Sequence, residues 1–309
     1  MTDGVLAIVA PGQGAQKPGM LAPWLELDGV DALLAEFSQS TELNLTQLGT
    51  EADAEEIKDT AVTQPLVVAT ALIAATQLEI PASAVAAGHS VGELAAAAIA
   101  GVLDAATATA LAARRGRAMA AACMLSPSSM AACMNPDTER VLELLAERDL
   151  VGANVNGGGQ IVAAGAADAI ALLAADPPDG IRVIQLPVAG AFHTHFMQPA
   201  QAELTPIVGR LAPGRPVRPL LTNSDGSVVD DGARYVELLL AQITSPVRWD
   251  LCMKTFAELG VTGVLELPPA GTLVGLAKRE LKGVATLACK TPDDLDAAAA
   301  FIAQHGGAA

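Results

Sequence analysis

Aromatic side chains are scarce in this sequence, at 3% of its 309 residues, so Ala, Val and Leu must fill the core. Basic side chains are also few: 18 Lys and Arg stand against 34 Asp and Glu, a formal net charge of −16. A surface this acidic repels nucleic acid and anionic membranes, because both carry negative charge. We therefore expect neither as a partner.

Long apolar runs and metal-binding motifs are missing as well. The longest apolar run, residues 65–76, falls short of the roughly 20 residues that span a bilayer, and the N-terminus lacks a signal-peptide pattern, so we expect a cytoplasmic protein. No C-x-x-C or H-E-x-x-H motif occurs, which excludes the common zinc sites and a disulfide framework. We expect no bound metal, and reduced core positions for the four cysteines: Cys123, Cys133, Cys252 and Cys289.

One pentapeptide, Gly88-His89-Ser90-Val91-Gly92, carries a specific chemical signal. This G-x-S-x-G pattern lies between a short apolar run and an Ala-rich helical run, the strand–turn–helix setting of a nucleophile elbow. The glycines allow the tight turn, and the helix N-terminus favours negative charge at the exposed serine. With 28 glycines in the chain the pattern can arise by chance, but its flanks favour a nucleophilic Ser90.

Strand and helix patterns alternate along the chain and predict an α/β fold with a mostly parallel sheet. Residues 127–188 instead predict the β-α-β-β-α-β order of a ferredoxin-like unit. We therefore expect a small ferredoxin-like domain (127–188) inserted into an α/β-hydrolase-like large domain (1–126 and 189–309). Outside the insertion, the expected elements are strands at 5–11, 84–87, 219–222 and 261–265, and helices from Pro65 to about 77, from the Asp104 cap to about 123, after 195, near 236 and 251, and from 293.

A serine nucleophile needs a base at neutral pH. His89 is adjacent to Ser90, but neighbouring side chains splay away from the serine at a sharp elbow. His193 follows the insertion, so we expect it within hydrogen-bond reach of Ser90 in the cleft between the two domains. The alternative for His193 is an exposed helix cap, and His195 is expected at the surface.

A second glycine-rich segment, residues 11–16, lacks both the dinucleotide-binding and the P-loop fingerprints. It offers either a hydrogen-bond donor to an oxyanion or a simple tight turn.

Several motifs in one order make a more specific pattern. They are Gly12-Gln13-Gly14-Ala15-Gln16, Gly88-His89-Ser90-Val91-Gly92-Glu93, Arg115-Gly116, Asn154-x-Asn156-x-x-x-Gln160, Ala191-Phe192-His193-Thr194 with Met197, and Pro246-Val247-Arg248-Trp249. Together they resemble the malonyl-CoA:acyl-carrier-protein transacylases, stand-alone acyltransferases of type II fatty-acid synthesis. The resemblance covers nearly the whole chain and differs at residues 267–271, where the family has Gly-Pro-Gly, and at Thr194, where Ser is more common.

The resemblance implies a ping-pong transfer of malonyl from malonyl-CoA to the phosphopantetheine thiol of acyl carrier protein, in fatty-acid or polyketide synthesis. Ser90 would be the nucleophile and His193 the base, oriented by a backbone carbonyl at Gln242. Gln13 and the N–H of Val91 would form the oxyanion hole. No cofactor is implied beyond the substrate, and we expect a monomer.

Arg115 would bind the malonyl carboxylate, because a guanidinium pairs bidentately with a carboxylate. An acetyl group would then leave a partly buried guanidinium unpaired. Phe192 would leave little room for an α-methyl group. Arg114 and Arg117 share a helix face and are expected to be solvated. Acyl carrier proteins of this kind are acidic, which makes three basic residues candidates for docking: Lys278, Arg279 and Lys282.

Two rival functions remain open at this point. A patatin-like serine hydrolase uses a Ser–Asp dyad with a D-G-[GA] triplet, which Asp231-Gly232-Ala233 fits by letter, although that segment reads as a surface turn. A non-catalytic module that binds carrier proteins is disfavoured, because a nucleophile, a base and a carboxylate-binding arginine are all present.

Overall fold

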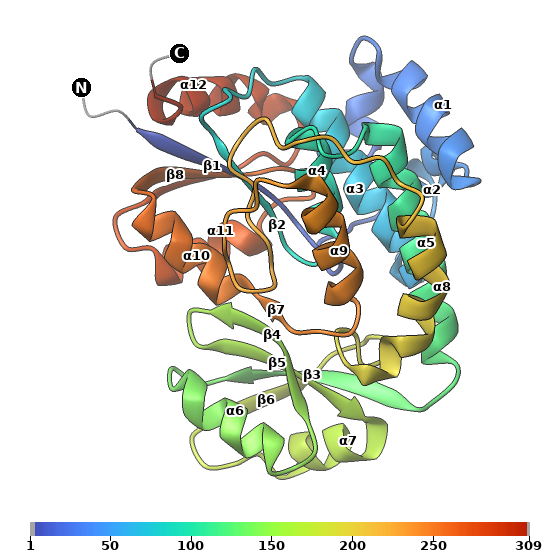
Figure 1. The fold of residues 1–309 in the computed structure, drawn as a ribbon, viewed down its shortest axis with the longest axis vertical. Helices are drawn as coiled ribbons and strands as arrows, with labels where there is room; N and C mark the ends of the chain where they lie inside the picture. Colours follow the sequence, from blue (N-terminus) through green and yellow to red (C-terminus); the bar gives the residue numbers. More distant parts are fainter. Residues whose placement is uncertain (1–3, 308–309) are drawn as a thin grey trace.

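The computed structural model describes residues 4–307, which form an α/β fold around two sheets (Figure 1). The first sheet is parallel, in the order β2-β1-β8-β9. Its strands are β1 (Val5–Ala10), β2 (Val85–Gly88), β8 (Val261–Glu266) and β9 (Ala285–Ala288). The α/β fold with a parallel sheet predicted from the sequence is confirmed.

Helices cover both faces of this sheet, so its central strand is buried on both sides. In β1, Leu6, Ile8 and Ala10 pack into one hydrophobic cluster, whereas Ala7 and Val9 pack into another. In Figure 1, α3, α4 and α5 lie on one side of the sheet and α10 and α11 on the other. The helices outside the second sheet are α1 (Val30–Thr41), α2 (Leu45–Thr50), α3 (Thr60–Thr76), α4 (Gly92–Ile99), α5 (Ala105–Cys123), α8 (Gln198–Val208), α9 (Gly232–Gln242), α10 (Trp249–Glu258), α11 (Thr272–Glu280) and α12 (Leu295–His305).

The second sheet has the order β6-β3-β5-β4-β7. Its elements are β3 (Ser128–Met134), α6 (Thr138–Ala146), β4 (Val151–Gly157), β5 (Gln160–Ala166), α7 (Ala167–Ala175), β6 (Arg182–Gln185) and, from the later chain, β7 (Val247–Arg248). The expected β-α-β-β-α-β order is therefore present. Because β7 pairs with β4 in parallel, this sheet is tied to the segment that leads into α10.

Two expected boundaries are wrong. The helix expected to begin at Pro65 begins at Thr60, because the Asp59 side chain caps it by accepting from the Ala61 N–H at 2.8 Å. Its interior is almost wholly buried, so tertiary packing holds a helix that contains a proline. The strand expected at 219–222 is reduced to two isolated bridges, from Leu220 to Ala86 and from Leu221 to Val228.

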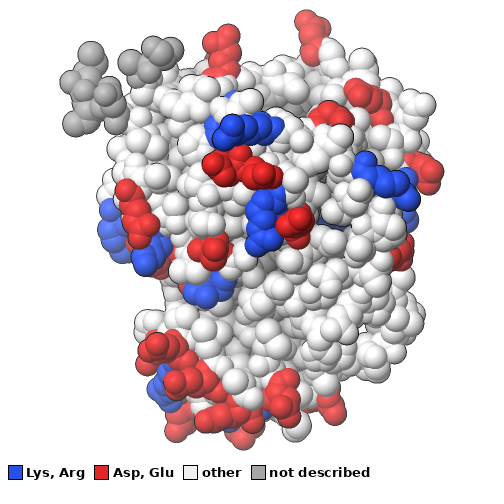
Figure 2. Space-filling model, in the orientation of Figure 1, with Lys and Arg blue, Asp and Glu red and all other residues white. Residues whose placement is uncertain are grey.

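Charged side chains are unevenly distributed over the surface, and the cysteines lie inside. Acidic side chains gather over the lower sheet and its helices in Figure 2, whereas most of the visible Lys and Arg lie higher, around the parallel sheet. All four cysteines are free and buried, as expected. Within residues 4–307, no helix is both long and apolar enough to cross a membrane.

Candidate active site

Ser90 sits on a sharp turn between β2 and α4, which confirms the strand–turn–helix expectation. Its backbone is left-handed, with φ of 54°, which is unusual for a residue other than glycine. A Cβ atom on Gly88 would collide with the backbone of Gly92, and one on Gly92 would collide with the carbonyl of Ala10. Both glycines are therefore needed for the turn that presents the serine hydroxyl.

His193 reaches Ser90 across 103 residues of chain. Its Nε2 lies 2.8 Å from Ser90 Oγ, and its Nδ1 lies 2.8 Å from the carbonyl oxygen of Gln242. Since a carbonyl only accepts, Nδ1 carries the proton and Nε2 presents a lone pair to the hydroxyl. Burial, together with the charge of Arg115, lowers the pKa of His193 to about 3, so the ring is neutral at neutral pH.

The alternative reading of His193 as an exposed helix cap is wrong. Only 3% of the residue is exposed, and its φ of 62° places it, like Ser90, in the left-handed region. The cap is its neighbour Thr194, whose hydroxyl accepts from the Phe196 N–H. His195 is exposed and stacks against Phe196, as a surface residue would.

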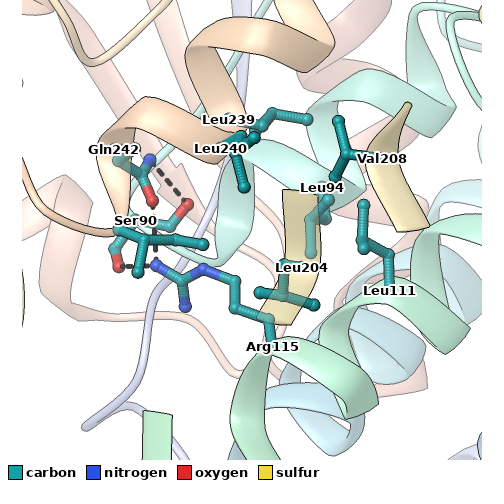
Figure 3. Close-up of a pocket in the computed structure, with 10 residues that line it drawn as sticks. Ser90, Leu94, Leu111, Arg115, Leu204, Val208, Leu239, Leu240 and Gln242 are labelled. Carbon is teal, nitrogen blue, oxygen red and sulfur yellow. Dashed lines mark hydrogen bonds between the residues drawn. The ribbon is translucent and has the colours of Figure 1, made fainter. Parts of the chain in front are cut away.

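Arg115 extends from α5 to the same hydroxyl and is only 5% exposed. Its Nη2 donates to Ser90 Oγ at 3.3 Å and to Gln242 Oε1 at 2.9 Å (Figure 3). Its Nη1 donates to Gln64 Oε1 at 2.7 Å. Burial lowers the pKa of Arg115 to about 10, which leaves it charged at neutral pH. Because two amides already accept from it, the guanidinium is not left unpaired without a carboxylate, contrary to the expectation.

Gln242 does more than the sequence suggested. Besides the carbonyl that faces His193, its side chain accepts from Arg115 at Oε1 and donates from Nε2 to the carboxyl group of Glu93 and to the Ser90 carbonyl, the latter at 3.2 Å. One residue at the end of α9 thus contacts the serine, the histidine and the arginine.

The two expected oxyanion donors lie beside the elbow. Val91 is the N-cap of α4, so its N–H belongs to the first-turn donors that have no acceptor within the helix. The turn that carries Gln13 approaches closely, since a Cβ atom on Gly12 would lie 2.7 Å from the His89 carbonyl oxygen. The Gln13 side-chain amide donates one of its two hydrogens to Thr60 Oγ1 at 3.1 Å, so its second amide hydrogen and its backbone N–H are the candidate donors to an oxyanion.

Asn223 is a buried site residue that the sequence analysis missed. Its Oδ1 accepts from the Ser90 N–H at 2.8 Å, and its Nδ2 donates to the Gly88 carbonyl at 2.8 Å. These two bonds hold the elbow from outside the motif. Gln64 is the second missed residue, and both side chains are buried. Asn223 stands in a polar, turn-like stretch, Thr222-Asn223-Ser224-Asp225-Gly226, so no sequence signal marks it as a buried site residue.

His89 faces away from Ser90, as expected, and joins the elbow to the second sheet. Its Nε2 lies 2.8 Å from Asn156 Oδ1, and Asn156 Nδ2 donates to Gln160 Oε1 at 2.9 Å. The Asn156 and Gln160 of the motif therefore bridge β4 and β5 to the nucleophile turn.

The remaining candidates lie apart from these groups. Asp231 is exposed and caps α9 by accepting from the Arg234 N–H at 2.9 Å, which gives no support to a Ser–Asp dyad. Arg114 is exposed, as expected, whereas Arg117 is only partly exposed and donates to the Thr41 carbonyl at 3.0 Å.

A pocket with an empty volume of about 300 Å³ opens beside Ser90, Arg115 and Gln242 (Figure 3). Its other walls are aliphatic: Leu94, Leu111, Leu204, Val208, Leu239, Leu240 and Ile243. Among the described residues, no group of three or more His, Cys, Asp or Glu could hold a metal ion. The site thus offers a serine, a neutral imidazole and a fixed cation in a mostly dry environment.

Comparisons with known proteins give the same family. The model of the acyl transferase domain matches residues 8–306. A malonyl CoA-acyl carrier protein transacylase of Mycobacterium bovis is 50% identical over 297 residues, covering 94% of this chain and 98% of the relative.

Solved structures agree with this match. A crystal structure of MCAT from Mycobacterium tuberculosis superposes with a TM-score of 0.91 at 49% identity, covering 96% and 99% of the two chains. A malonyl-transacylase solved in complex with a type II PKS acyl-carrier protein superposes at 0.89 and 29% identity, covering 96% and 99%. The chain belongs to the acyl transferase family and, within it, to the malonyl CoA-acyl carrier protein transacylases.

Proposed function

We propose that this chain moves a malonyl group from malonyl-CoA to the phosphopantetheine thiol of an acyl carrier protein through an ester on Ser90. The observation that carries the proposal is the meeting of three groups at one oxygen: Ser90 Oγ lies 2.8 Å from His193 Nε2 and 3.3 Å from Arg115 Nη2. The names of relatives that match over more than nine-tenths of the chain support the substrate and the acceptor.

In the first half-reaction, His193 Nε2 takes the proton of Ser90 as the serine oxygen attacks the thioester carbonyl. The tetrahedral intermediate then collapses, the carbon–sulfur bond breaks, and the imidazolium returns the proton to the leaving CoA thiolate. In the second half-reaction the pantetheine thiol gives its proton to His193 and attacks the ester, and Ser90 leaves with that proton. The low pKa of His193 supports its role as a base that starts neutral.

The backbone N–H groups of Gln13 and Val91 would stabilise the oxyanion, and loss of one such donor typically costs about 3 kcal/mol of barrier. Arg115 would hold the malonyl carboxylate, so that the ester is oriented and shielded from water. Phe192, next to His193 in the chain, would exclude an α-methyl substituent.

The proposed reaction also has consequences for cofactors, oligomeric state and the carrier protein. The reaction uses no cofactor besides its CoA substrate, and a single chain supplies every group that it needs, which supports a monomer. For the acidic carrier protein we propose a docking surface at Lys278, Arg279 and Lys282. Lys278 and Arg279 lie in the last turn of α11. The Arg279 side chain packs beside Gly158, in the turn between β4 and β5.

We also propose that residues 127–188 are a ferredoxin-like domain inserted into the large domain formed by 1–126 and 189–309. The strand order β6-β3-β5-β4 supports this. When the four strands of the unit are numbered along the chain, the order is 4-1-3-2, as in a ferredoxin-like sheet. The catalytic groups would then lie in the large domain, with the inserted domain contributing Asn156 at the elbow.

The test separates the two half-reactions. The wild-type protein is incubated with malonyl-CoA alone, its intact mass is measured, and holo acyl carrier protein is then added. The proposal predicts one malonyl adduct on the protein that moves to the carrier. His193→Ala should abolish both steps, while Asp231→Ala should leave both unchanged. Loss of activity in Asp231→Ala with retention in His193→Ala would overturn the proposal in favour of a Ser–Asp hydrolase.

A further inference from the structure

Glu93 is a buried carboxyl group directly beneath the nucleophile turn. It lies in the first turn of α4, three residues after Ser90, and is 1% exposed. Its Oε1 accepts from the Asn223 N–H at 2.7 Å and from the Tyr235 hydroxyl at 3.4 Å, and its Oε2 accepts from Gln242 Nε2. An acidic side chain is almost never fully buried unless it is paired, so these donors are what makes its position tolerable.

The contact with Gln242 connects Glu93 to the rest of the site. A glutamine amide has a donor end and an acceptor end, and its neighbours decide which way it faces. The Nε2 end donates to the carboxyl group of Glu93, and more distantly to the Ser90 carbonyl at 3.2 Å and to Asn223 Oδ1 at 3.3 Å, which leaves the Oε1 end facing Arg115 at 2.9 Å. The backbone carbonyl of the same residue accepts from His193 Nδ1.

Burial and the charge of Arg115 act on the Glu93 carboxyl group in opposite directions. Burial raises the pKa of Glu93 to about 8, and Arg115 acts in the opposite direction by attracting the ionised carboxylate. The other titratable groups that Glu93 influences, Tyr235 and Cys252, have their pKa raised by burial and by its charge. Arg115 is therefore the one cation among the groups coupled to Glu93 in the described residues.

We propose that Glu93 is a positioning residue that fixes the orientation of Gln242, and through it both the base His193 and the carboxylate-binding Arg115. This rests on the proposed malonyl transfer and extends it: one buried carboxyl group links proton transfer to recognition of a carboxylated acyl group. Glu93 does not touch the substrate in this account.

The substitution Glu93→Gln tests the link because it keeps the shape of the side chain. The new oxygen can keep the Asn223 N–H, but the new NH₂ then faces Gln242 Nε2, donor against donor. Turning the Gln242 amide relieves this contact but presents its NH₂ to Arg115. Turning the new amide instead sets its NH₂ against the Asn223 N–H, so either arrangement leaves donors facing each other. Glu266→Gln is the matched control, since Glu266 is also a fully buried carboxyl group but serves to accept from the N–H groups of Gly271, Leu273 and Val274 at the start of α11.

The readout is the rate of Ser90 acylation from malonyl-CoA and from acetyl-CoA, with thermal unfolding measured in parallel. In Glu93→Gln we expect the malonyl rate to fall at least about tenfold and the malonyl-to-acetyl ratio to fall at least about threefold. The reason is that buried hydrogen-bonding groups without a matching partner destabilise the arrangement that the reaction needs. In Glu266→Gln the ratio should stay at the wild-type value whatever happens to stability.

An unchanged ratio in Glu93→Gln would overturn the proposal, whether or not the total rate falls. If that variant does not fold, Glu93→Asp takes its place, because it keeps the acid and shortens its reach to Gln242; the same fall in ratio is expected, and an unchanged ratio again overturns the proposal. Failure of the proposed function is distinct, since the wild-type protein itself would then form no malonyl adduct.

Discussion

Removal of the Arg115 side chain should change which acyl group the protein accepts. A bidentate pair with a carboxylate comprises two charge-assisted hydrogen bonds at about 1.5–3 kcal/mol each, so Arg115→Ala should cost malonyl transfer roughly 3–6 kcal/mol. At about 1.4 kcal/mol per tenfold, kcat/KM for malonyl-CoA should fall roughly 10²- to 10⁴-fold. Acetyl transfer should fall far less, because an acetyl group has no carboxylate to pair with the guanidinium. It loses only the effect of the 3.3 Å contact between Arg115 Nη2 and Ser90 Oγ.

Stopped-flow or quenched acylation with malonyl-CoA and acetyl-CoA measures this difference directly. Arg114→Ala is the control, since that neighbour on the same helix is exposed and should leave both rates unchanged. Arg115→Ala also leaves the Gln64 and Gln242 acceptors without their donor, so unfolding must be followed to correct for the folded fraction. Equal loss for both acyl groups after that correction would remove Arg115 from the carboxylate-binding role.

Four further predictions concern the base and the elbow. Because the pKa of His193 is held at about 3 in the folded protein, kcat/KM should show no acid limb near pH 6.5, and the base should stay neutral as pH falls toward 5; an inflection near 6.5 would contradict the account. The pKa of His193 in the unfolded chain is its ordinary value of 6.5. As pH falls below 6.5, the unfolded state therefore binds a proton at this histidine and the folded state does not, so the free energy of unfolding should decline. Gly92→Ala should lower the free energy of unfolding in urea by about 1–3 kcal/mol or more, whereas Gly275→Ala, with open space at its Cβ position, should not lower it. Asn223→Ala should slow acylation by both acyl-CoAs, because it loosens the backbone of Ser90. The malonyl-to-acetyl ratio should fall less than in Glu93→Gln, because the Gln242 amide loses only its 3.3 Å contact with Asn223 and keeps Glu93 and the Ser90 carbonyl as acceptors. A fall in the ratio as large as in Glu93→Gln would refute that division of roles.

The parts of the fold that follow from local chemistry could be predicted from the sequence. Gly88 and Gly92 permit a turn so tight that any Cβ atom there would collide with backbone, and Asp104 caps α5 by accepting from the Thr107 N–H. The placement of His193 near Ser90 depended on the chain order around the insertion, and the 2.8 Å distance meets that expectation.

The rest depends on contacts that no local pattern encodes. Glu93, Asn223 and Gln64 are buried polar residues whose partners at the site lie far along the chain. Gln64 is 51 residues from Arg115, Asn223 is 133 residues from Ser90, and Glu93 is 149 residues from Gln242, so nothing in their own segments reveals what they bind. Pro65 signals a helix start by propensity, but the helix begins five residues earlier, at Thr60, because α3 is buried and Asp59 caps it. The segment at 219–222 is apolar enough for a strand, yet it meets β2 only at Leu220.

The most direct test of the central claim is the mass of the protein after incubation with malonyl-CoA, compared between wild type and Ser90→Ala. The account predicts a single malonyl adduct on the wild-type chain, located to Ser90 by peptide mapping and discharged by holo acyl carrier protein, and none on the variant. A Ser90→Ala protein that still carries malonyl, or that still loads the carrier at the wild-type rate, would contradict it.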